Sequence, residues 1–235
     1  WKLKPKLEIK PFYSKSIEEV VFITTMRTSE VNIKKFVKLK IIGVGGAGGN
    51  TLSRIKRGRI PTVELVAVNT DAQDLRTTKA DVKIRIGKNA TRGLGAGMDP
   101  VIGAKAAEED IEELKKVIRG LDLLVIAAGF GGGTGSGAAP VIAEIAREMG
   151  ILTFAIFTKP FAFEGPQRKA IAEEAAVKMQ DRVDSYLMIE NDRIAQVVDA
   201  DTSIDEAFMK VDEILKSVIV GFAEIIAYPG LVNVD

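Results

Sequence analysis

Apolar and polar positions along the chain repeat an order of strand, loop and helix from Val37 onward. The runs "LLVIAAGF" and "ILTFAIF" are continuously apolar, which is typical of strands covered on both faces. The segment between them, "AAPVIAEIAREMG", has a helical pattern. This alternation predicts an α/β fold, a Rossmann-like parallel sheet with helices on both faces.

The same pattern gives approximate element positions. We expect strands at residues 36–44, 63–71, 82–87, 121–130 and 151–160. We expect helices at 48–58, 100–118 and 138–150, one starting in "NTDAQDL" and another starting near Pro166.

A long helix is predicted near the end of the chain, where apolar residues recur alternately four and three positions apart. They are Ile204, Phe208, Val211, Leu215, Val218, Phe222 and Ile225. We interpret them as the buried stripe of one C-terminal core helix, because the repeat is too short for a coiled coil.

The first 37 residues form a separate N-terminal arm in this interpretation, and residues 38–235 form the main domain. Residues 6–12 and 19–25 have the β-branched and aromatic content of strands, which Pro5 and Pro11 interrupt. Residues 1–40 contain ten Lys or Arg against four Glu, but these are dispersed. We therefore expect a solvated extension and no nucleic-acid partner.

Composition narrows the possible chemistry. The chain of 235 residues is 46% hydrophobic and 28% charged, which is ordinary for a globular protein. It contains no cysteine and no histidine, so thiolate chemistry, disulfides and histidine-ligated zinc are excluded. No apolar run reaches the roughly 20 residues of a membrane span, and no signal peptide is evident. We expect a cytoplasmic protein.

Glycine is concentrated in three loops, which hold 14 of the 22 glycines. These are residues 43–49, 93–97 and 129–137. The first and third follow strands and open helices, so a parallel sheet would bring them to one edge. Bare backbone amides at two helix N-termini predict a phosphate site.

Two kinds of nucleotide site fit these loops. Gly43, Gly45 and Gly48 satisfy G-x-G-x-x-G, and Asp71 follows where a ribose-binding acid belongs in an NAD-dependent oxidoreductase. The Walker pattern G-x-x-x-x-G-K-[ST] does not occur. A polyphosphate would then be held by backbone amides, the hydroxyls of Thr134 and Ser136, and a cation such as Mg²⁺.

Six motifs resemble the tubulin/FtsZ family of GTPases, and its FtsZ branch more than eukaryotic tubulin. In chain order they are "IIGVGGAGGN", "VAVNTDAQDL", "TRGLGAGMDP", "AAGFGGGTGSGAAP", "TKPFAFEGPQR" and "YPGLVNVD". The resemblance covers residues 38–235. It implies a GTP-binding domain of a cell-division GTPase that self-associates into protofilaments and normally carries a second, C-terminal domain.

The resemblance also implies the binding residues. Around the phosphates it gives Gly45, Gly46, Ala47, Gly48, Gly49, Asn50, Asp71, Ala72, Ala96, Gly97, Gly131, Gly132, Gly133, Thr134, Gly135, Ser136 and Gly137. Around the sugar and base it gives Glu164, Asn191, Phe208 and Asp212, with Arg168 as a phosphate and sugar contact; Pro160 is a further binding residue. The ligands of the metal are not identified.

Guanine specificity has a physical basis in this set. Guanine presents N1–H and N2–H₂ as adjacent donors that one carboxylate, here Asp212, can accept together. Phe208 lies one turn earlier on the same helix and would stack on the base. Without the resemblance, the apolar pattern indicates that Phe208 is a core residue. Asp212 could then be a solvated acid on the helix as readily as a base-binding residue.

Hydrolysis in the family is completed between subunits by a loop after the long helix. The resemblance assigns Asn233 and Asp235 to that loop. The sequence stops before the family's next acid, so we expect this chain to bind GTP and GDP with little turnover alone. Pairing with a separate C-terminal half is an open possibility, as is a third function, a non-catalytic assembly module that holds nucleotide structurally.

Overall fold

A computed structural model describes residues 21–24, 37–58, 63–195 and 202–227. One seven-stranded sheet organises them, in the order β1-β7-β6-β5-β2-β3-β4. From the second position the strands are β7 (Ser185–Glu190), β6 (Leu152–Lys159), β5 (Leu123–Gly129), β2 (Leu39–Val44), β3 (Glu64–Asn69) and β4 (Val82–Arg85). These six are mutually parallel, which confirms the predicted α/β sheet.

Alternate residues of the strands β7, β6, β5, β2 and β3 enter two separate cores. Ile42 and Val44 pack on one face of the sheet, whereas Leu39 and Ile41 pack on the other. In β5 the first six residues are buried. The continuous apolar runs in the sequence therefore reflect strands that are covered twice.

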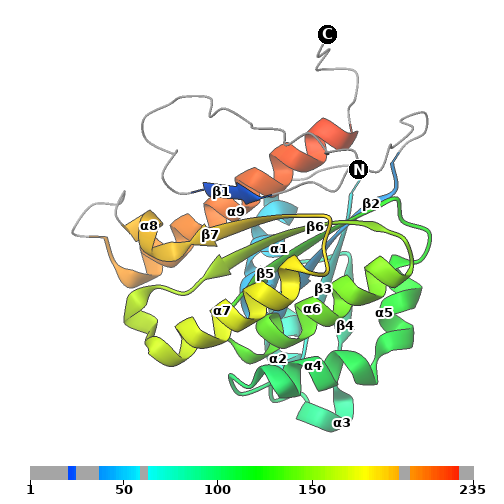
Figure 1. Ribbon diagram of the computed structural model, residues 1–235, viewed down its shortest axis with the longest axis horizontal. Helices are drawn as coiled ribbons and strands as arrows, with labels where there is room; N and C mark the ends of the chain where they lie inside the picture. The colour runs from blue at the N-terminus through cyan, green and yellow to red at the C-terminus, as the bar shows by residue number, and fades with distance from the viewer. Residues whose placement is uncertain (1–20, 25–36, 59–62, 196–201, 228–235) are drawn as a thin grey trace, which may run out of the picture.

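Two helical layers cover the sheet (Figure 1). One contains α4 (Pro100–Glu109), α5 (Ile111–Ile118), α6 (Gly133–Glu148) and α7 (Pro166–Gln180). The other contains α1 (Gly45–Gly58), α2 (Ala72–Thr77) and α9 (Ile204–Ala227). The short helices α3 (Lys88–Thr91), η1 (Ala162–Glu164) and α8 (Asn191–Ala195) complete the elements of the described residues.

The predicted single helix over residues 100–118 is wrong. Helices α4 and α5 are separated at Asp110, whose φ of −112° and ψ of 27° are not helical. The Asp110 carboxylate accepts the backbone N–H of Gly87 at 2.7 Å. Tertiary hydrogen bonding thus breaks a segment that local propensity would have continued.

The buried face of α9 is also displaced from the predicted stripe. Its buried residues recur every four positions: Ala207, Val211, Leu215, Ile219 and Ala223. Of the predicted stripe, Ile204, Phe208 and Ile225 are 58%, 37% and 65% exposed. The alanines let α9 lie close to α1 and the sheet, and a pattern that counts only large apolar residues overlooks them.

One part of the arm belongs to the sheet. Strand β1 (Val21–Thr24) pairs antiparallel with β7, so the strand predicted within residues 19–25 is present. The strand predicted at residues 6–12 lies outside the described residues. Among the helices that the structure describes, none is long and apolar enough to span a bilayer.

Candidate functional site

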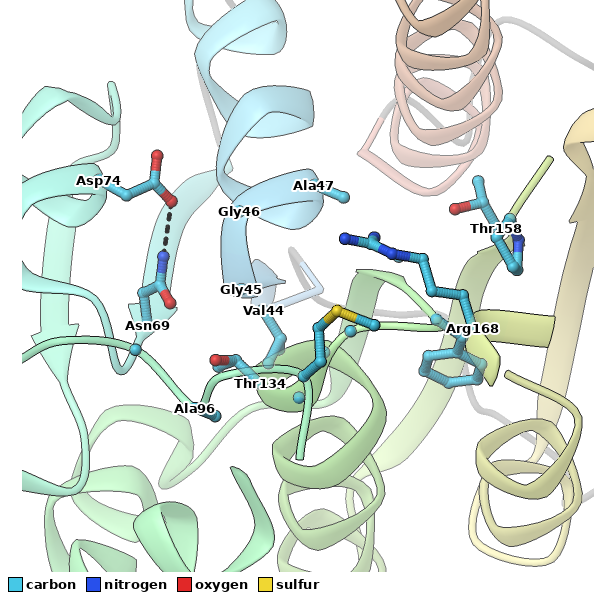
Figure 2. A pocket seen from close by; sticks show the side chains of 18 of the residues that line it. Val44, Gly45, Gly46, Ala47, Asn69, Asp74, Ala96, Thr134, Thr158 and Arg168 are labelled. Carbon is cyan, nitrogen blue, oxygen red and sulfur yellow. Dashed lines mark hydrogen bonds between the residues drawn. The ribbon is translucent and has the colours of Figure 1, made fainter. Parts of the chain in front are cut away.

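A pocket of about 500 Å³ lies where four adjacent parallel strands end. Val44 of β2, Asn69 of β3, Gly129 of β5 and Thr158 of β6 all line it (Figure 2). The carboxyl edge of a parallel sheet is the expected ligand site of this fold. The predicted convergence of the first and third glycine loops is therefore present.

The first glycine loop begins α1 directly at the end of β2. Gly45 has φ of +71°, a conformation that glycine adopts without strain. An ideal Cβ on Gly45 would lie 3.1 Å from the backbone nitrogen of Gly135, so the starts of α1 and α6 meet here. Gly46 and Ala47 line the pocket and are exposed to it.

The third glycine loop carries α6 into the same space. A Cβ on Gly135 would collide with the carbonyl oxygen of Gly129, so only glycine permits this approach. The Thr134 hydroxyl lies 2.6 Å from that of Thr70 and faces the pocket. Ser136 is buried instead, and its Oγ accepts the N–H of Gly131 at 2.9 Å. Ser136 thus stabilises the loop by a hydrogen bond and does not line the pocket.

The second glycine loop forms another wall of the pocket. Its residues Gly95, Ala96 and Gly97 line the cavity together with Met98, which follows the loop. The backbone N–H of Ala72 donates to Gly93 O at 3.0 Å, which ties this loop to the start of α2. All three glycine loops therefore contribute to one site.

Two acids stand beside the glycine loops. Asp71 Oδ1 caps α2 by accepting the N–H groups of Gln73 and Asp74 at 2.8 and 3.0 Å. Asp74 Oδ2 accepts from Asn69 Nδ2 at 2.7 Å (Figure 2). Burial, and then the charge of Asp71, raises the pKa of Asp74 above its ordinary value. No pattern in the sequence pointed to Asp74.

The opposite end of the pocket is aromatic and rich in acceptors. Phe208 stands edge-on to Phe161, with ring centroids 5.1 Å apart, and is partly exposed to the pocket rather than buried in the core. Asn191 is 4% exposed, and its Oδ1 is fully buried without a hydrogen-bond donor in the described part of the chain. Such an acceptor favours a ligand that donates.

Asp212 lines this end of the pocket from α9. Its Oδ2 accepts from Arg54 Nε of α1 at 3.0 Å. Burial raises the pKa of Asp212, and the hydrogen bond and charge of Arg54 act in the opposite direction.

Glu164 and Arg168 form the wall near η1 and α7. Glu164 Oε1 accepts the N–H of Phe161 at 2.9 Å, and Oε2 lies 3.2 Å from Arg168 Nη1. Figure 2 shows the Arg168 side chain extending into the pocket. Among the described residues that line the pocket, Arg168 is the single Lys or Arg, against the acids Asp71, Asp74, Glu164 and Asp212.

The sixteen predicted residues that line the pocket come from all three loops and both ends of the cavity. They are Gly45, Gly46, Ala47, Asp71, Ala96, Gly97, Gly132, Gly133, Thr134, Gly135, Pro160, Glu164, Arg168, Asn191, Phe208 and Asp212.

The other predicted residues lie behind this lining or beyond it. They are Gly48, Gly49, Asn50, Ala72, Gly131, Ser136 and Gly137. Gly48 and Gly137 allow close packing, because a Cβ on Gly48 would come within 2.6 Å of Ala127 O and one on Gly137 would collide with Pro100 O. Asn233 and Asp235 lie outside the described residues.

Further lining residues were not among the predicted binding residues, although Gly95 and Gly129 lie in the glycine loops identified from the sequence. They are Val44, Asn69, Asp74, Leu94, Gly95, Met98, Gly129, Phe130, Thr158, Val211 and Leu215. Val44 and Phe130 are the last residues of predicted strands, and that position was itself a usable signal.

Comparison with known proteins agrees with this geometry. The family model described as "Tubulin/FtsZ family, GTPase domain" matches residues 38–199. The chain belongs to the tubulin/FtsZ family. A cell division protein FtsZ of Buchnera aphidicola subsp. Schizaphis graminum is 48% identical over 205 residues, covering 87% of this chain and 53% of that protein. The chain spans about half the length of the curated relatives it matches.

Solved structures of the family share the fold. An empty FtsZ dimer of M. jannaschii aligns with a TM-score of 0.82 at 44% identity, covering 86% of this chain and 58% of that one. CetZ2 of Haloferax volcanii, a GTPγS-bound protofilament, aligns with a TM-score of 0.72 at 28% identity, covering 84% and 61%. These findings favour the tubulin/FtsZ interpretation over the dinucleotide fold.

Proposed function

We propose that this chain is the guanine-nucleotide-binding domain of a cytoplasmic, polymer-forming GTPase of cell division. The observation that carries the proposal is the division of one pocket into two chemically different ends. Glycine-rich backbone and helix N-termini form one end, and a ring with two side-chain acceptors forms the other.

The acceptor end suits guanine. Asp212 would accept N1–H and N2–H₂ together, the buried Oδ1 of Asn191 would accept a further ligand donor, and Phe208 would stack on the ring. Adenine has no adjacent pair of donors on its Watson–Crick edge to meet a carboxylate. Glu164 and Arg168 lie between the two ends, where ribose and phosphate would run.

The glycine end suits phosphates with a bound cation. Four acids and one arginine line the pocket, so a polyphosphate needs additional positive charge there. Mg²⁺ usually takes one or two protein carboxylates and completes its shell with phosphate oxygens and water. Asp71 and Asp74 fit that requirement, and when bound the ion would neutralise charge on the phosphates. No larger cluster of acids suited to a metal occurs in the described ranges.

Hydrolysis and assembly follow from family membership as proposals for the intact protein. The FtsZ dimer and the CetZ2 protofilament among the similar structures support self-association. In such an assembly a neighbouring copy would supply the acids that activate water, and Asn233 and Asp235 remain our prediction for that loop. A separately made C-terminal half remains a possible partner.

A change of base preference tests this function. Asp212→Asn replaces one acceptor by a donor, so it should weaken GDP binding by about 10- to 100-fold and improve binding of xanthosine diphosphate, whose O2 replaces the guanine amine. The measurement is competition against a fluorescent nucleotide. Unchanged GDP affinity, or displacement of the probe by NAD rather than GDP, would contradict the proposal.

A further inference from the structure

Among the described residues, Asp212 has one hydrogen-bond partner, and that partner comes from an element distant in the sequence. Arg54 lies in α1, 158 positions before Asp212, and donates its Nε–H to Oδ2 at 3.0 Å. Both side chains are largely enclosed, at 25% and 14% exposure. Arg54 does not itself line the pocket, whereas Asp212 does. The arginine therefore supports the carboxylate from outside the ligand space.

The bond leaves the carboxylate able to bind a ligand. Each carboxylate oxygen has two lone pairs, so one bond from Arg54 to Oδ2 leaves Oδ1 and a second lone pair of Oδ2 available. The bond also restricts rotation of the Asp212 side chain. A carboxylate that accepts two adjacent donors must hold both oxygens in the plane of the base, so this restriction has a direct use.

The charge of Arg54 has a second effect. Burial alone favours the protonated form of Asp212, which would present an O–H donor towards another donor. Arg54 opposes this by its hydrogen bond and its charge. The same helix that carries Arg54 supplies Gly45, Gly46 and Ala47 to the phosphate end, so α1 connects both ends of the pocket.

We propose that Arg54 is a positioning residue for nucleotide specificity, which orients Asp212 to accept a guanine base. This inference rests on the proposed function, because it assigns Arg54 a role only through the base-reading role of Asp212. Arg54 makes no contact with the base in this scheme.

A double-mutant cycle tests it. GDP and ADP affinities are measured by competition for the wild type, Arg54→Leu, Asp212→Asn and the double variant. We expect Arg54→Leu to weaken GDP binding about tenfold and leave ADP binding nearly unchanged. If Arg54 acts through Asp212, the double variant loses no more GDP affinity than Asp212→Asn alone. Additive losses, or an unchanged preference for GDP in Arg54→Leu, overturn the proposal.

Matched variants separate positioning from folding. Arg54→Lys keeps a cation and should bind GDP within about threefold of the wild type. Lys40→Leu removes a different ion pair, between Lys40 Nζ and Glu64 Oε2 at 2.7 Å, outside the pocket lining, and should leave the preference unchanged. If Arg54→Leu does not fold, Arg54→Gln keeps a donor without the charge and should show an intermediate loss. If Arg54→Lys loses as much GDP affinity, relative to the wild type, as Arg54→Leu does, the result counts against the proposal.

The two proposals fail differently. A wild-type chain that binds GDP and ADP equally overturns both the proposed function and the role of Arg54. A wild-type chain that prefers GDP, together with an Arg54→Leu variant that prefers it equally, overturns the role of Arg54 alone.

Discussion

At the scale of single residues, the site is defined by polar groups whose environments differ from those of surface residues. Asn191 Oδ1 is buried without a partner in the described chain, and Asp74 carries a raised pKa beside a glycine loop. Each of these features costs folding stability in the empty protein. Replacing either residue should therefore have different effects on nucleotide binding and on the folding stability of the empty chain.

Asn191→Ala should affect the empty and the nucleotide-bound chain differently. An unsatisfied buried acceptor costs about 1–3 kcal/mol, so its removal offsets much of the packing that the side chain loses. We expect little change in Tm without nucleotide and a clear decrease in the additional stability conferred by GDP. Thermal unfolding with and without GDP measures both. A GDP-dependent increase in Tm equal to that of the wild type would contradict a ligand role for Asn191.

Asp74→Asn should stabilise the empty chain in a pH-dependent way. Because the folded pKa of Asp74 lies above its ordinary 3.8, the folded state holds this charge at a cost above the raised pKa. The cost declines as the pH falls through the raised pKa and is gone below about 3.8. We expect a Tm about 1–3 °C above the wild type at pH 7. Melting curves down to the acid range would show the gap closing; a gap that widens in acid would exclude this explanation.

At the scale of elements, glycine sets how closely α1 and α6 approach the strand ends. Gly135 packs against the carbonyl of Gly129, whereas a Cβ on Gly132 would meet nothing within 4 Å. The two glycines lie in the same loop and both line the pocket, so they form a matched pair.

Gly135→Ala should destabilise the chain by about 1–3 kcal/mol, because the added methyl group forces α6 away from β5. Gly132 has a φ of −99°, which alanine adopts readily. Gly132→Ala should therefore leave the free energy of unfolding within about 0.5 kcal/mol of the wild type. Denaturant unfolding measures both. Equal destabilisation by the two substitutions would contradict the packing described for this loop.

The sequence predicted those helices and strands whose positions are determined by a local pattern of apolar residues. The doubly covered strands β5 and β6 and helix α6 could be placed from apolar runs and glycine. Strand β7, with mixed exposure, was not identified, and the break at Asp110 depends on a hydrogen bond to Gly87. The pairing of Arg54 with Asp212 joins two helices that are 158 positions apart in the sequence, and no local pattern encodes it.

At the scale of the whole molecule, the sheet order brings the ends of four neighbouring strands together and converts dispersed motifs into one pocket. Sequence motifs located most of the lining, because three glycine loops follow or approach strand ends. The pKa shifts of the acids could not be predicted in the same way. Those of Asp74 and Asp212 depend on burial and on partners from other elements. Family membership and the pocket geometry both support the guanine nucleotide that we propose as the ligand.

Calorimetric titration of the purified, folded chain with GDP, and separately with ADP, tests the central claim most directly. The described geometry predicts measurable heat with GDP in the presence of Mg²⁺ and an affinity at least about tenfold weaker for ADP, because adenine lacks the paired donors that Asp212 would accept. Absence of binding heat with GDP over a range of temperatures, or equal affinity for the two nucleotides, would contradict it.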